Sequence, residues 1–142
     1  MTQVDFYILE QPHSPSLPLM ACRVADKAFR NGHRVYVLAS DTRQAEELDQ
    51  LMCTFSQGSF TPHETYAGTI ENEQTPILIG TGDAPESWHD ILITLTEDVP
   101  PFFSRFERVI EIVGQEENQK KNARDRFRFY RDRGYALQSH PV

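Results

Sequence analysis

Apolar residues along the chain form short runs that alternate with segments of helical spacing. The runs are rich in branched and aromatic side chains, which is typical of strands buried in a sheet. They predict strands over Val4–Glu10, Arg34–Ala39, Ile77–Gly80, Ile91–Leu95 and Val109–Val113, with a further edge strand over Ala136–Gln138. The segment Thr54–Glu73 shows no such period, and a short helical turn is expected around Phe102–Glu107.

Two helices are expected after the first two strands. Their apolar positions recur three and four residues apart, as Leu17, Ala21, Val24, Ala25 and Ala28 in one and Ala45, Leu48 and Met52 in the other. Ser16 is placed to cap the first helix, and Asn31-Gly32 to end it. Asp41 with Gln44 forms a variant capping box before the second. Strands separated by helices predict a mostly parallel sheet with right-handed crossovers, so an α/β protein is expected.

The length and composition are those of one ordinary domain, here residues 1–142. The chain is 39% hydrophobic and 25% charged. No apolar run approaches the roughly 20 residues that span a membrane. The N-terminus lacks the features of a signal peptide, so a cytoplasmic protein is expected. Cys22 and Cys53 are too few for a disulfide framework and are expected to be small buried or half-buried thiols.

The most unusual stretch is Gln115–Tyr135, which is expected to form one helix that ends at Gly134. Its segment Lys120–Arg133 holds seven basic and two acidic residues, a net charge of +5 in a chain whose net charge is −7. At about 100° per residue, four basic side chains fall within roughly one quarter of the circumference. This basic row consists of Lys120, Arg124, Arg128 and Arg131. An apolar seam runs beside the basic row, and Phe127 lies at its nearer edge.

A cationic row bordered by an aromatic ring suits a ligand that is both anionic and apolar. A solvated charged face explains the same pattern, because most charge runs are solvated surface. Direct binding of single-stranded DNA is a third interpretation, for which Phe127 and Phe129 are the only candidate stacking rings on this helix. The pattern does not decide whether Arg126, Arg131 and Arg133 belong to such a site.

Motifs for catalysis and cofactor binding are missing from the sequence. The first strand-to-helix turn, QPHSPSLP, has no glycine that would let backbone amides approach a pyrophosphate. The sequence Gly80-Thr81-Gly82 follows a strand, but Pro85 stands where a third glycine would be, so a simple turn is expected. His89 and Asp90 are neighbours on an expected strand and would point to opposite faces. We therefore expect no catalytic residue, no metal and no cofactor.

Several stretches, taken in order, resemble the chi subunit family of bacterial DNA polymerase III. They are VDFYILE, GHRVYVLASDTRQAEELDQLM, SFTPH (Ser59–His63), DILITL, FERVIEIV and ARDRFRFYRDRGY, which together cover nearly the whole chain. The resemblance implies a noncatalytic accessory subunit with a Rossmann-like fold, a three-layer sandwich around the sheet. It also implies two partners. One is the psi subunit of the clamp-loader complex, and the other is the acidic C-terminal tail of single-stranded DNA-binding protein, which ends in Ile-Pro-Phe.

The resemblance assigns residues to both partners. The family's tail-contacting positions correspond to Lys120, Arg124, Phe127 and Arg128. The family often has tyrosine where this chain has Phe127, so one hydroxyl group is missing here. The psi contact is expected over Met52–His63, with the apolar anchors Met52, Phe55, Phe60 and Pro62.

The sequence thus favours a protein–protein adaptor in DNA replication that is not an enzyme and does not bind nucleic acid strongly by itself. The alternative is a nucleotide-binding or enzymatic Rossmann-like domain of unknown substrate. The two classes differ in what they require: the first needs an accessible cationic and aromatic surface, and the second needs a phosphate cradle.

Overall fold

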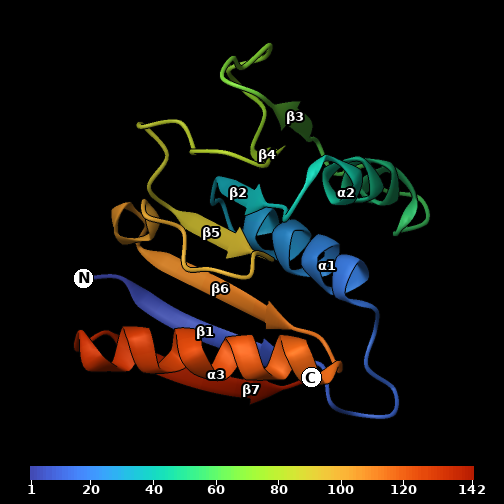
Figure 1. Ribbon diagram of the computed structural model, residues 1–142. Helices are drawn as coiled ribbons and strands as arrows, with labels where there is room; N and C mark the ends of the chain where they lie inside the picture. Colours follow the sequence, from blue (N-terminus) through green and yellow to red (C-terminus); the bar gives the residue numbers. More distant parts are fainter.

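The computed structural model describes residues 1–142 and centres on one sheet of seven strands (Figure 1). In spatial order the strands are β3 (Glu64–Tyr66), β4 (Ile77–Gly80), β2 (Val35–Leu38), β5 (Ile91–Thr94), β6 (Arg108–Val113), β1 (Gln3–Ile8) and β7 (Ala136–Pro141). All six neighbouring pairs are parallel. The expected α/β class with a mostly parallel sheet is therefore confirmed.

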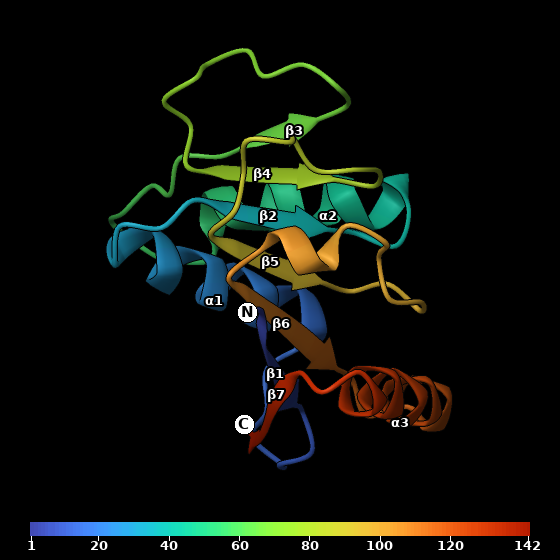
Figure 2. The same cartoon turned by 90° about the vertical axis from the view of Figure 1, so that its left-hand side faces the viewer.

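Helices cover both faces of the sheet. The helices are α1 (Leu17–Arg30), α2 (Thr42–Thr54) and α3 (Glu117–Asp132), and a short 3-10 turn, η1, spans Phe103–Arg105. Residues of α1 and α2 pack in one hydrophobic cluster, and residues of α3 and η1 pack in a second cluster on the opposite face. Figure 2 shows the strands stacked from β3 at the top to β1 and β7 at the bottom, with α3 beside the lower strands. The result is the three-layer, Rossmann-like sandwich that the resemblance implied.

Side chains along the central strands point alternately into these two clusters. On β2, Val35 and Val37 point into the cluster that contains Leu48 of α2, whereas Tyr36 points into the cluster that contains Tyr130 of α3. Because both faces are covered, all four residues of β2, β4 and β5 are buried. This explains why these strands read as continuous apolar runs in the sequence.

The local signals at the helix ends have the expected chemistry. The Ser16 hydroxyl oxygen accepts a hydrogen bond from the Leu19 amide at 3.3 Å, and Gly32 ends the turn after α1 with φ of 88°. Asp41 accepts a hydrogen bond from the Gln44 amide at 2.8 Å. The Gln44 side chain, however, reaches back to the Ser40 amide, one residue before the position that a capping box uses.

The edges of the sheet differ most from the sequence-based expectation. Strand β3 lies within Thr54–Glu73, where no strand was predicted, and β7 is longer than the three residues expected. Both are edge strands without a buried residue, so hydrogen bonding to β4 or β1 defines them rather than an apolar pattern. No helix combines the length and apolar character that crossing a bilayer requires.

Candidate functional site

Helix α3 carries the predicted basic row, and its ends are fixed by the sequence around it. Glu116 caps the first turn, and the Gln119 side chain accepts a hydrogen bond from the Glu116 amide, which completes a capping box. At the other end, Gly134 takes a φ of 80°, a conformation that glycine adopts without strain. The helix is therefore held at both ends in the register that the sequence predicted.

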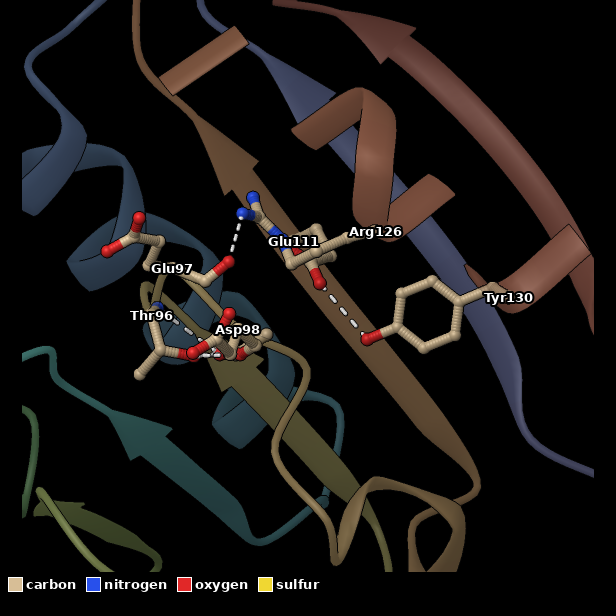
Figure 3. Close-up of polar contacts among 7 residues, drawn as sticks. Thr96, Glu97, Asp98, Glu111, Arg126 and Tyr130 are labelled. Carbon is tan, nitrogen blue, oxygen red and sulfur yellow. Dashed lines mark hydrogen bonds and ion pairs between the residues drawn. The ribbon is translucent and has the colours of Figure 1, made fainter. Parts of the chain in front are cut away.

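A buried ion pair attaches α3 to the sheet (Figure 3). The Arg126 Nε donates to Glu111 Oε1 of β6 at 2.8 Å, and its Nη1 donates to the Glu97 carbonyl at 2.9 Å. The Tyr130 hydroxyl donates to the other oxygen of Glu111 at 3.0 Å. Glu111 is completely buried, with an exposed fraction of 0%. We call these three residues, Glu111, Arg126 and Tyr130, the anchor network.

Burial governs the protonation of the anchor network. Desolvation raises the pKa of the Glu111 carboxyl above its usual range, and the nearby Arg126 charge opposes that rise. Desolvation, together with the Glu111 charge, also raises the pKa of the Tyr130 hydroxyl. The sequence left the role of Arg126 open, and the structure places it inside the protein as a structural ion-pair partner. The sequence contains one signal of this buried ion pair, which the sequence analysis did not use. It is Glu111, a single carboxylate within the apolar run of β6.

The side chains predicted to meet an anionic ligand lie on one flank of α3. Lys120 and Arg124 make no ion pair with any residue of the chain. Arg128 pairs with Asp125 one turn earlier on the helix surface, where both side chains are more than half exposed. Exposed pairs of this kind contribute about 0–1 kcal/mol and exchange readily for another partner. The three cations are thus available to an external anion.

Phe127 stands between this flank and the core. Its half-buried ring lies 5.4 Å from the ring of Phe6 on β1, at an interplanar angle of 57°. Two partly buried apolar side chains, Ile8 of β1 and Leu137 of β7, pack against the same hydrophobic cluster. Phe127 therefore offers the exposed part of its ring as apolar area beside the basic row.

The arginines at the C-terminal end of α3, Arg131 and Arg133, contact neighbouring residues of the same helix. Arg131 contacts Asp132 at 3.3 Å. The guanidinium of Arg133 lies 3.6 Å from the centroid of the Phe129 ring and donates to the Phe129 carbonyl. Phe129 also packs 6.0 Å from the ring of Phe103 of η1, on the flank away from Phe127. Neither of the rings considered for DNA stacking is fully exposed.

The second predicted surface is only partly accessible. Phe60 is exposed over 64% of its surface, and Phe55 and Pro62 are half-buried. Met52 is 1% exposed, so its side chain offers almost no surface to a partner in this structure. The reason is the helical period itself: Met52 lies four residues after Leu48, and both face the sheet.

The positions considered for catalysis have separate structural contacts. The Gly82 carbonyl accepts a hydrogen bond from the Tyr36 hydroxyl at 2.6 Å, and Gly80 lies directly against that hydroxyl. His89 and Asp90 precede β5 instead of lying on it, and they contact Arg105 and Arg34 respectively. No group of three or more His, Cys, Asp or Glu residues is arranged to hold a metal ion.

A polar groove of about 480 Å³ lies at the carboxyl ends of β2, β5 and β6. Ligands of α/β proteins commonly bind at this edge of the sheet. Its lining includes Lys121, Asn118 and the Arg126 side chain of the anchor network. It lies on the flank of α3 away from Phe127 and uses none of the predicted site residues.

The fold is that of a Rossmann-like α/β domain. Its main candidate binding surface is the basic row of α3 with the ring of Phe127 beside it. The sequence profile described as "DNA polymerase III chi subunit, HolC" matches residues 1–138. The chain therefore belongs to the DNA polymerase III chi subunit family. This membership supports a role as an accessory subunit in DNA replication.

Curated relatives carry the same description over nearly their full lengths. The DNA polymerase III subunit chi of Pseudomonas aeruginosa is 40% identical over 99% of this chain and 96% of its own. That of Escherichia coli is 30% identical over 96% of each chain. Among solved structures, bacteriophage T4 UvsW matches 99% of this chain and 41% of its own, with a TM-score of 0.72. At 8% identity, that likeness concerns the fold alone.

Proposed function

We propose that this protein is an adaptor of the replication machinery with two binding surfaces. The basic row and Phe127 bind the acidic C-terminal tail of single-stranded DNA-binding protein. The segment around Phe60 pairs with the psi subunit, which connects the adaptor to the clamp loader. The adaptor performs no chemistry of its own in this proposal.

One observation carries the tail-binding proposal: Lys120 and Arg124 are free of internal ion pairs and lie on the flank of α3 that also holds Phe127. A tail that ends in Ile-Pro-Phe presents side-chain carboxylates, a terminal carboxylate and an apolar ring. Ammonium and guanidinium groups form charge-assisted hydrogen bonds with the carboxylates. The half-buried ring of Phe127 offers apolar area that suits the terminal ring.

A peptide ending in Asp-Ile-Pro-Phe tests the tail site by calorimetric titration. Lys120→Glu and Arg124→Glu are each expected to weaken binding at least tenfold, because each replaces an attraction with a repulsion. Lys121→Glu is the matched control, since it makes the same charge change on the same helix but on the flank that lines the polar groove. Equal binding by all four proteins removes α3 from the tail site.

The psi proposal rests on Phe60, whose large apolar ring is 64% exposed. Such a ring, with Phe55 and Pro62 beside it in the sequence, fits an apolar partner surface. Phe60→Ala is expected to abolish co-purification with the psi subunit of the organism that encodes this chain. The same variant should bind the tail peptide as the unmodified protein does, which shows that the fold is intact. Unchanged co-purification excludes Phe60 from the psi contact.

A further inference from the structure

The segment Ser59–His63, just before β3, carries both exposed and buried side chains without forming a helix or a strand. Phe60 points out and is 64% exposed. Thr61 is buried, and the His63 side chain is only 4% exposed. An exposed apolar ring on an irregular segment needs fixed neighbours if it is to keep one position. Thr61 and His63 supply those fixed points.

Thr61 attaches the segment to α1. Its hydroxyl donates to Asp26 Oδ1 at 2.8 Å, and both residues are buried. The other carboxylate oxygen of Asp26 accepts from Arg30 Nη2 at 2.8 Å. The acceptor is therefore itself oriented by an ion pair, and the hydroxyl of Thr61 has a defined partner.

His63 attaches the segment to α2 through both ring nitrogens. Its Nδ1 lies 2.7 Å from the Thr61 carbonyl oxygen. Its Nε2 lies 3.1 Å from the Asp49 carbonyl oxygen and 3.2 Å from Asp49 Oδ1. Carbonyl and carboxylate oxygens accept hydrogen bonds, so a protonated ring nitrogen donates to one of these oxygens. The ring is therefore held between the Thr61 carbonyl and α2.

The ring of His63 also supports the exposed ring directly. The centroids of the Phe60 and His63 rings lie 5.7 Å apart, at an interplanar angle of 37°. Any loss of the His63 contacts would thus release the surface against which Phe60 rests. We call Asp26, Asp49, Thr61 and His63 the clasp.

We propose that Thr61 and His63 are positioning residues that hold Phe60 out for the psi subunit. This inference rests on the proposed function, because it requires Phe60 to contact psi.

Groups of two helices surround the clasp. On α2, the Cys53 thiol donates to the Asp49 carbonyl, and its Sγ lies 3.6 Å from His63 Nε2. On α1, Asp26 and Arg30 reach the segment through Thr61.

Two substitutions test the clasp without removing the ring contact. Thr61→Val deletes the hydroxyl but keeps the shape, and His63→Phe keeps a flat ring beside Phe60 but deletes both N–H donors. Each is expected to weaken psi binding about tenfold and to leave tail-peptide binding within twofold of the unmodified protein. His140→Phe is the matched control. His140 lies on β7, at the opposite edge of the sheet, and its Nε2 lies 3.1 Å from Asp5 Oδ1 of β1.

Calorimetric titration with psi measures both losses of affinity. Full-strength psi binding by Thr61→Val and His63→Phe overturns the clasp, while Phe60→Ala, measured in parallel, reports separately on whether Phe60 contacts psi at all.

Discussion

Phe127 joins the proposed tail site to the hydrophobic core. Its ring packs against Phe6, and it lies on the same flank of α3 as Lys120 and Arg124. A phenyl ring contributes apolar contact area but no hydrogen bond, whereas the family often has a tyrosine here. In the proposed site, the polar contacts between this part of α3 and the tail therefore come from the cationic side chains alone.

Adding the missing hydroxyl should strengthen tail binding. We expect Phe127→Tyr to raise the affinity for a peptide ending in Asp-Ile-Pro-Phe about two- to tenfold, the range of one hydrogen bond of about 0.5–1.5 kcal/mol. Calorimetry measures the gain, and Phe129→Tyr on the other flank is the control that should leave the affinity unchanged. An unchanged or lower affinity for Phe127→Tyr would show that the ring edge does not face the peptide.

Helical spacing predicted the faces on which some of these residues lie and left others undecided. It grouped Lys120, Arg124 and Arg128 correctly, because the angle between residues depends only on the helix. It could not show that Arg126 is internal, because its partner Glu111 lies 15 positions earlier in the chain. It also placed Met52 on the inner face of α2, and the assignment of Met52 to a partner came from the resemblance alone.

At the scale of the element, the anchor network fixes how α3 is rotated on the sheet. Hydrophobic contacts alone allow a helix to rotate about its axis. The ion pair between Arg126 and Glu111 requires that Arg126 face β6. Tyr130, one turn beyond Arg126, meets the second oxygen of the same carboxylate. This rotation decides that Phe127 and the basic row face the β7 side of the molecule.

Breaking the anchor network should cost stability in a pH-dependent manner. Arg126→Met is expected to destabilise the fold by about 3–5 kcal/mol near neutral pH, because it leaves the buried Glu111 charge unpaired. Burial already raises the pKa of Glu111 above its reference value of 4.5, and loss of Arg126 removes the opposing charge. A carboxyl group whose pKa is higher in the folded state stabilises that state below the unfolded pKa and loses this contribution as pH rises.

Urea unfolding followed by circular dichroism tests this expectation. The free energy of unfolding of Arg126→Met should fall as the pH is raised from about 4.5 towards neutrality. Arg126→Met with Glu111→Gln removes the charge but keeps an oxygen for Tyr130, and should recover about 1–2 kcal/mol with little pH dependence. A double variant no more stable than Arg126→Met would contradict the unpaired charge as the cause.

The elements themselves were predictable to different degrees. Central strands such as β4 coincide with the predicted range, since burial on both faces leaves an unbroken apolar run. Strand β3 was not predicted because its three residues, Glu64–Tyr66, are only partly buried. Its position follows from backbone pairing with β4, which depends on residues distant in the sequence. The clasp was missed for the same reason, although its residues Thr61 and His63 lie within the SFTPH stretch.

At the scale of the whole molecule, the two proposed surfaces lie at opposite edges of one rigid sheet. Phe60 precedes β3, which forms one edge, whereas α3 packs against β6 and β7 at the other edge. With strands roughly 4.8 Å apart, the edge strands are separated by about 29 Å. This distance exceeds the Debye length of about 8 Å at physiological ionic strength, so a charged partner at α3 has little direct influence on the Phe60 surface.

Both partners should therefore bind at the same time and independently. Saturating the protein with the psi subunit is expected to leave its affinity for the tail peptide within twofold, because the two surfaces lie far apart on the sheet. Fluorescence polarisation of a labelled peptide, measured with and without psi, gives the ratio directly. Raising the salt concentration should weaken the peptide contact much more than the psi contact, since only the former depends on exposed opposite charges. Competition between psi and the peptide would mean that the two partners share a surface, and the adaptor would then hold them in turn instead of linking them.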